Sequence, residues 1–72
     1  MDRKLAEYKS NEGLGRVEVW FDHGEEAGRL EYYDSNGTRF FTEEFPNKSV
    51  HYLHDAAENW ASGIKKIETL YG

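Results

Sequence analysis

Hydrophobic and polar residues alternate along the first two thirds of the chain, as they do in β-strands that bury one face. The clearest segment is 16–22, where Val17, Val19 and Phe21 share one face and Trp20 lies on the other. Strands are expected within residues 3–45, at 3–8, 16–22, 29–33 and 38–45. Polar connections rich in glycine separate these segments. The pattern therefore predicts an antiparallel meander of four strands, or of three if the first is frayed.

The dipeptide Asn36-Gly37 is the strongest turn signal in the chain. Both residues readily adopt the positive φ angles of a two-residue hairpin turn. A turn centred there predicts three facing pairs, Asp34 with Arg39, Tyr33 with Phe40, and Tyr32 with Phe41. This register directs Phe41 to the face of Val17 and Phe40 to the opposite face, whereas a three-residue loop with a bulge would exchange the two phenylalanines.

The last third of the chain has the periodicity of one amphipathic helix, predicted at about 49–68. Its apolar stripe consists of Leu53, Ala56, Ala57, Trp60, Ile64 and Ile67. Ser49 is the expected N-cap. The alternative is an extended segment at 50–52 and a helix that begins near Leu53. Gly63 then lies inside the helix beside the apolar stripe, which predicts that it allows a close approach of helix and sheet.

Together these elements predict a single α+β domain over residues 1–72. An antiparallel sheet of three to four strands packs on one C-terminal α-helix, in the order ββββα. The predicted core consists of Leu5, Val17, Val19, Phe21, Leu30, Tyr32, Phe41, Leu53, Ala57, Trp60, Ile64 and Ile67. One helix can cover only one face of such a sheet, so the other face is expected to be open.

Composition narrows the classes of function. The 72 residues contain no cysteine and carry a net charge of −5. No disulfide framework is therefore expected, and the negative charge makes direct binding to a nucleic-acid backbone unfavourable. No apolar run reaches the roughly 18 residues of a membrane span, and no signal-peptide core follows the N-terminus. We expect a soluble, cytoplasmic protein with no membrane association.

The open sheet face is the best candidate site. Aromatic residues make up 15% of the chain, which is more than one side of a small sheet needs. The predicted register gathers Trp20, Tyr33 and Phe40 on this face, ringed by Glu18 and Glu31. Exposed aromatic side chains are typical of protein interfaces, where they commonly supply most of the binding energy. These five residues are the expected partner-binding site, either for another protein or for a homodimer.

Other arrangements of this face remain open at the level of sequence. Tyr8 and the terminal Leu70-Tyr71 could fold over the aromatic residues, or the two faces could be inverted. An aromatic sheet face can also stack nucleic-acid bases. The acidic residues around it argue against that use here.

Two further constellations have a plain structural explanation as well as a functional one. His51 and His54 lie near Asp55 and Glu58, as in a small metal-binding protein with imidazole and carboxylate ligands. A solvated helix face is the favoured explanation, because the spacing is weak and no third His or Cys completes a site. His23 lies in an acidic turn, as a general base or any polar loop residue does. No nucleophile motif or phosphate loop is present. We expect no catalytic residue, no cofactor and no metal site.

The acidic residues suggest one alternative function. A phosphate-mimicking surface that inhibits a nucleic-acid-binding protein could be formed by Glu25, Glu26, Glu43 and Glu44 together with Glu18, Asp22 and Glu31. Basic residues interrupt them along the chain, at Arg16, Arg29, Arg39 and Lys48. An ordinary soluble surface has the same mixed composition.

The stretch Lys48-Ser49-Val50-His51-Tyr52-Leu53-His54-Asp55-Ala56-Ala57-Glu58-Asn59-Trp60, above all its second half, resembles the C-terminal part of small uncharacterised proteins encoded by marine cyanophages, which are tailed bacteriophages. Those proteins have a similar β-rich first half with an Asn-Gly or Asp-Gly turn. The resemblance implies a phage accessory protein in a bacterial cytoplasm, and such proteins commonly bind host proteins. We therefore expect a small, non-enzymatic protein-binding module.

Overall fold

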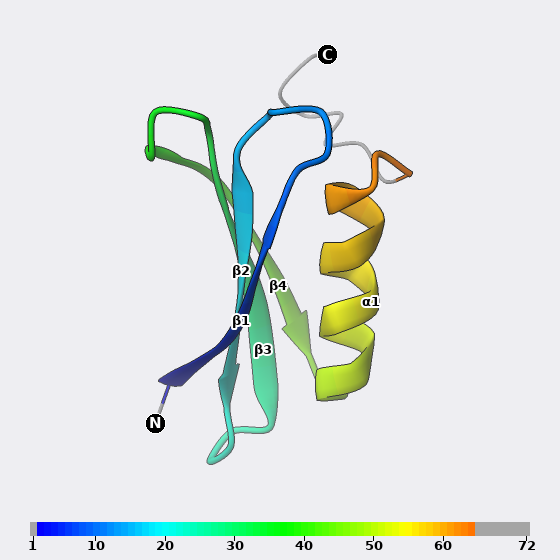
Figure 1. Ribbon diagram of the computed structural model, residues 1–72. Coiled ribbons are helices and arrows are strands. Elements are labelled where there is room, and N and C mark those ends of the chain that lie inside the picture. The colour runs from blue at the N-terminus through cyan, green and yellow to red at the C-terminus, as the bar shows by residue number, and fades with distance from the viewer. Residues whose placement is uncertain (1, 65–72) are drawn as a thin grey trace.

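The computed structural model describes residues 2–64 and shows one sheet with one helix beside it (Figure 1). The strands are β1 (Asp2–Lys9), β2 (Arg16–Asp22), β3 (Ala27–Tyr33) and β4 (Arg39–Pro46), and the helix is α1 (Val50–Ala61). Each strand pairs antiparallel with the next, in the order β1-β2-β3-β4. The predicted ββββα meander is confirmed, with all four strands formed.

The core lies between α1 and one face of the sheet, called the helix face below. Its buried hydrophobic residues are Val17, Val19, Phe21, Leu30, Tyr32, Leu53, Ala57, Trp60 and Ala61. Leu5 and Phe41, also predicted as core, are partly buried and pack against these residues. Ala61 was not predicted. Ile67 lies outside the described residues, as do Leu70 and Tyr71, so their predicted positions are not tested.

The helix ends at Ala61 rather than near residue 68. Gly63 has a φ of 87°, a left-handed conformation that residues with a Cβ rarely adopt. The amides of Gly63 and Ile64 donate to carbonyls of the last helical turn, so Gly63 forms a C-terminal cap. The predictions of a mid-helix Gly63 and a buried Ile64 are therefore wrong. Ile64 follows the cap and is 75% exposed.

Helix and sheet approach closely at Gly28 of β3 instead. A Cβ at this position would lie 2.2 Å from Cδ1 of Leu53, so the leucine side chain fills the space that glycine leaves. The helix begins as predicted, because the Ser49 hydroxyl accepts a hydrogen bond of 3.2 Å from the amide of Tyr52. This cap fixes the start of α1 at Val50.

Each edge strand contains one extra residue relative to its neighbour, a β-bulge. In β1 the extra residue is Leu5, because Lys4 pairs with Trp20 and Ala6 already pairs with Val19. A bulge allows two successive side chains to turn toward one face. Leu5 and Ala6 accordingly both pack against the core.

The bulge in β4 corrects the predicted position of Phe40. The hairpin loop contains residues 35–37, because the amide of Asp34 donates to the carbonyl of Thr38 at 2.9 Å. This longer loop shifts the register by one residue, and the extra residue Phe40 shifts it back. The resulting pairs are Tyr33 with Arg39 and Tyr32 with Phe41. Of the three predicted pairs, that of Tyr32 with Phe41 is confirmed and the other two are wrong.

Phe40 therefore turns toward the core instead of the open face. Its ring centre lies 6.3 Å from that of Tyr32, and its side chain packs against the buried cluster. Phe41 also packs there, with its ring centre 5.7 Å from that of Tyr32. The bulge thus brings both phenylalanines to the helix face, an arrangement that neither predicted register contained.

Candidate functional site

Two segments with the same sequence pattern lie side by side on the outer face, the face of the sheet away from α1. β2 contains Arg16-Val17-Glu18-Val19-Trp20, and β3 contains Arg29-Leu30-Glu31-Tyr32-Tyr33. Each segment reads arginine, any residue, glutamate, any residue, aromatic. Antiparallel pairing sets Arg16 opposite Tyr33, Glu18 opposite Glu31, and Trp20 opposite Arg29. These six residues, related by an approximate twofold axis, form what we term the outer-face lattice.

Each arginine of the lattice covers the aromatic ring on the opposite strand. The guanidinium carbon of Arg16 lies 4.2 Å from the centre of the Tyr33 ring, and that of Arg29 lies 4.9 Å from the Trp20 ring. A cation at this distance from an aromatic face is attracted to it. Trp20 and Tyr33 are consequently only partly exposed.

Each glutamate of the lattice is held by groups on its own strand. Glu18 accepts hydrogen bonds from Trp20 Nε1 at 3.1 Å and from the Arg16 guanidinium at 3.3 Å. In the same way, Glu31 accepts from the Tyr33 hydroxyl at 2.9 Å and from Arg29 Nε at 2.6 Å. The twofold relation therefore extends from the backbone to the side-chain hydrogen bonds.

The two glutamates are 6% exposed and lie directly opposite each other, which by itself is destabilising. Additional cations offset this repulsion, since Lys4 lies 3.3 Å from Glu18 and Arg39 lies 3.7 Å from Glu31. Burial raises the pKa of the Glu18 carboxyl, but hydrogen bonds from Trp20 and Lys4 and the charge of Lys4 outweigh it. The pKa of Glu18 is therefore lowered overall, and this carboxylate stays ionised at neutral pH.

The outer face contains most of the residues of the predicted site, but their arrangement differs from the predicted one. Trp20 and Tyr33 lie there with Glu18 and Glu31, as the alternation indicated, whereas Phe40 does not. The glutamates occupy the centre instead of the rim, and arginines cap the aromatic rings. The signal that could have revealed this is the arginine two positions before each glutamate.

Across all four strands, the outer face carries its charges in rows. The first row is Lys9, Arg16, Tyr33 and Arg39, and the second is Glu7, Glu18, Glu31 and Thr42. The third row is Lys4, Trp20, Arg29 and Glu44, and the fourth is Asp2, Asp22, Ala27 and Pro46. The signs are basic, acidic, mainly basic and acidic. Attraction between neighbouring rows offsets the repulsion within each row.

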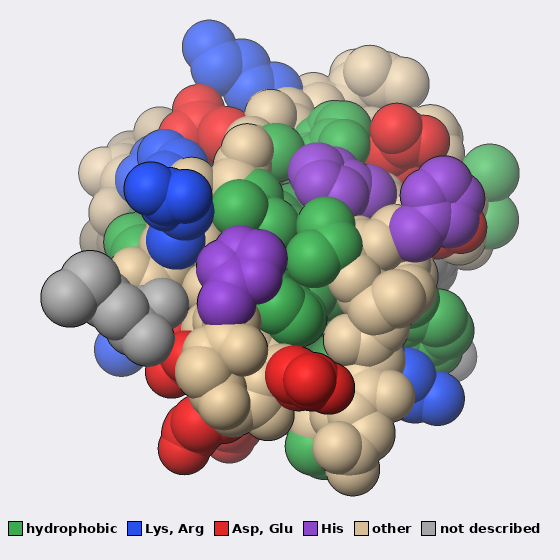
Figure 2. All heavy atoms as spheres, turned by 90° about the horizontal axis from the view of Figure 1, so that it is seen from below, with side chains coloured by type: hydrophobic (Ala, Val, Ile, Leu, Met, Phe, Trp, Pro, Cys, Tyr) green, Lys and Arg blue, Asp and Glu red, His purple; other side chains and the backbone are tan. Residues whose placement is uncertain are grey.

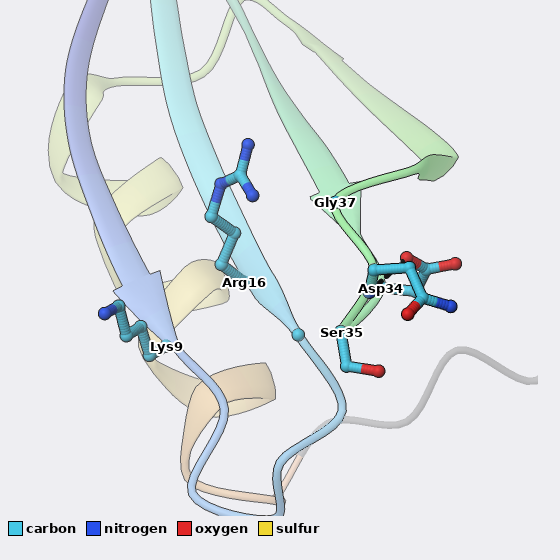
Figure 3. A pocket seen from close by; sticks show the side chains of 7 residues that line it. Lys9, Arg16, Asp34, Ser35 and Gly37 are labelled. Atoms are coloured by element: carbon cyan, nitrogen blue, oxygen red, sulfur yellow. Dashed lines mark hydrogen bonds between the residues drawn. The ribbon is translucent and has the colours of Figure 1, made fainter.

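The first row borders a hollow of about 320 Å³. Figure 3 shows Lys9 and Arg16 on one side of it and the turn 34–37 on the other. The Asp34 carboxylate accepts hydrogen bonds from two backbone amides of this hairpin, at 2.9 and 3.0 Å, so its charge is engaged in the hairpin. We term Lys9, Arg16 and Arg39 the basic end of the outer face.

The opposite end of the same face is acidic. A hollow of about 210 Å³ there is lined by Asp2, Asp22, Glu25, Ala27, Gly28, Arg29 and Glu44. Arg29 forms an ion pair with Asp2, and the Asp22 carboxylate accepts from the backbone amides of residues 24 and 25. We term Asp2, Asp22, Glu25 and Glu44 the acidic end.

The histidines make contacts outside this face. His54 Nδ1 and the Tyr8 hydroxyl share a hydrogen bond of 2.7 Å, which places Tyr8 against the helix and not over the outer face. The ring centre of His23 lies 4.9 Å from that of Phe21. Figure 2 views the end of the molecule where α1 begins, and histidine side chains surround hydrophobic ones there. Within residues 2–64, no group of three or more His, Cys, Asp or Glu side chains could hold a metal ion.

Four glutamates of the acidic alternative, Glu25, Glu26, Glu43 and Glu44, are distributed over different surfaces. Glu25 and Glu44 line the acidic end. Glu43 accepts a hydrogen bond of 3.0 Å from the Tyr32 hydroxyl, and Glu26 lines a separate hollow beside the start of α1. The structure therefore provides no single surface formed by all four.

No protein family matches the chain, and no curated protein or solved structure matches it either. The segment 48–60 supplies Leu53, Ala57 and Trp60 to the core, so packing accounts for these three positions. Over residues 2–64, no helix is long and apolar enough to cross a membrane.

Proposed function

We propose that this protein is a small, non-enzymatic binding module whose outer face docks onto another protein surface. The observation that carries the proposal is the outer-face lattice, which holds Trp20 and Tyr33 in fixed orientations. Aromatic and arginine side chains are the types that most often dominate binding energy at interfaces. Side chains that are already ordered lose less conformational freedom on binding.

The placement of the helix supports docking through this face. α1 packs against β1, β2 and β3 on the helix face, and within residues 2–64 no helix or strand packs on the outer face. The charged ends of the outer face add orientation to any complex, because a partner gains attraction only where its own charges are opposite.

The partner in this proposal is either a different protein or a second copy of the chain. A bacterial cytoplasm as the setting, and a host protein as the partner, follow from the resemblance to phage accessory proteins and belong to the same proposal. A direct role in binding nucleic acid is not part of it, because the net charge is −5.

A capture experiment from a lysate of the producing cells, followed by lysine cross-linking, tests the proposal. Arg39→Glu alters an exposed side chain of the basic end, whereas Lys48→Glu makes the same charge change beside α1. We expect the wild type and Lys48→Glu to retain the same specific protein and Arg39→Glu to lose it. Cross-links should involve Lys4 and Lys9 on the outer face.

Trp20→Glu provides a second variant, with circular dichroism to check its folding. Capture that persists in both outer-face variants, with cross-links confined to Lys48, would contradict the proposal.

A further inference from the structure

The order of the charged rows makes the outer face complementary to itself. From one end to the other, the rows are basic, acidic, mainly basic and acidic. Two copies can pack face to face with their strands running in opposite directions. The first row of one copy then lies over the fourth row of the other, and the second row lies over the third. Every row then meets a row of opposite sign. The other twofold arrangement, with the axis along the strands, sets each row over its own equivalent and is repulsive.

We propose that the occupant of the outer face is a second copy of this chain, packed face to face with antiparallel strands about a twofold axis that crosses the strands between the second and third rows. The inference rests on the proposed function, since it names the partner for the same face. Its basis is charge complementarity, because nothing but the row order chooses between the two twofold arrangements.

The arrangement predicts specific contacts between the copies. Lys9 and Asp2 lie at opposite ends of β1, so Lys9 of each copy faces Asp2 of the other. Both are exposed. Within the described residues no contact engages the Lys9 ammonium group, whereas Asp2 also forms an ion pair with Arg29 of its own chain. Arg16 and Asp22 are related in the same way on β2. Each contact occurs twice in the pair, as a twofold axis requires.

The size of the outer face limits the expected affinity between the two copies. Four strands about 4.8 Å apart and seven residues of about 3.3 Å span a flat area of roughly 450 Å² per copy, before the relief of the side chains is counted. A standard stable interface buries about 800 Å² per partner. The pair is therefore a weak one, populated at high protein concentration and sensitive to salt, because its charges lie near the surface.

Sedimentation velocity on the full chain over a concentration series at low salt tests the inference. The wild type should form dimers that dissociate on dilution and on addition of salt. Lys9→Glu and Asp2→Lys each replace two attractions with two repulsions, so each should raise the dimer dissociation constant about tenfold. The double variant Lys9→Glu, Asp2→Lys reverses both partners and should bind more tightly than either single variant, although it also lacks the ion pair of Asp2 with Arg29.

Two controls match the net charge of the single variants. Lys48→Glu equals Lys9→Glu in charge, and Asp55→Lys equals Asp2→Lys, but both positions are exposed on or beside α1. Neither control should change the dissociation constant. If Asp2→Lys fails to fold, Glu25→Lys tests the same acidic end from an exposed loop position.

A wild type that stays monomeric over the whole series overturns the inference. So does a dimer that the single variants leave unchanged, that is no tighter in the double variant than in the single variants, or that the controls weaken equally. The capture experiment separates these outcomes from the proposed function. A monomer that captures another protein through the outer face leaves the proposed function standing, whereas a monomer that captures nothing contradicts both.

Discussion

The two faces of the sheet exclude water from the same strands by different means. On the helix face, Val17 and Val19 are fully buried beneath a separate element, α1. On the outer face, Glu18 and Glu31 are 6% exposed among neighbouring side chains that hydrogen-bond to them. Apolar side chains carry no charge that salt could screen or pH could titrate, whereas the charged outer-face lattice is subject to both. Similar burial on the two faces therefore rests on two kinds of interaction, apolar packing on the helix face and charged hydrogen bonds on the outer face.

The largest change in stability is expected on the helix face, at the contact between Leu53 and Gly28. Leu53→Ala should lower the free energy of unfolding by about 2–5 kcal/mol, because it leaves a cavity in the core. Gly28→Ala should cost about 1–3 kcal/mol, since its Cβ collides with the leucine. The double variant should cost less than the sum of the two, because removal of the leucine makes room for the new methyl group.

Urea denaturation at low and high salt measures all three variants, and their costs should not depend on salt. Additive costs in the double variant would show that Gly28 and Leu53 do not share this space.

On the outer face, Glu18→Gln is expected to cause a smaller loss of stability. The substitution removes the charge that binds Lys4 and Arg16, and it should cost about 1–2 kcal/mol at low salt. In about 1 M salt the cost should shrink, because those two cations are themselves partly exposed and are then screened. Glu58→Gln, on the exposed side of α1, is the matched control and should be neutral. An unchanged cost in high salt would mean that the lattice behaves like the helix face.

The smallest expected effect is a difference between the two faces in how their contributions to stability depend on pH. The pKa of Glu18 is lowered by its hydrogen bonds, so its contribution is present above the unfolded pKa of about 4.3 and is lost as pH falls through the lower folded pKa. The pKa of Tyr32 is strongly raised by burial and by Glu43. Its contribution is present below the unfolded pKa of about 10 and is lost as pH rises above it.

Urea denaturation between pH 2 and 11 checks this difference. Glu18→Gln should flatten the acidic limb of the stability curve and Tyr32→Phe the alkaline limb. An exchange of these effects would refute the assignment of one pH limit to each face.

Sequence periodicity correctly predicted which face each side chain lies on in strands whose alternation is not interrupted. Val17, Val19 and Trp20 reached their predicted faces because β2 contains no irregularity. Phe40 did not, since the three-residue loop and the bulge each shift the register by one and their effects cancel only beyond Phe40. Gly63 was misplaced because an apolar stripe at helical spacing contains no information about the φ of a glycine.

The layout of the outer face could not be read from alternation for a different reason. Alternation assigns Glu18 and Glu31 to the open face, but it treats that face as solvated. Their burial follows from cross-strand contacts of Arg16 and Arg29, which depend on the β2–β3 register. The charged rows likewise appear only when all four strands are aligned.

The bulges at Leu5 and Phe40 also bear on aggregation. An open sheet presents unpaired N–H and C=O groups along both edges, onto which the strand of another chain can add. A bulge bends the strand and disturbs the regular spacing of these groups, so we expect both edges of this sheet to be poor templates for growth into amyloid-like fibrils. The two residues that enlarge the core thus also help to keep an aromatic-rich chain from polymerising through its edges.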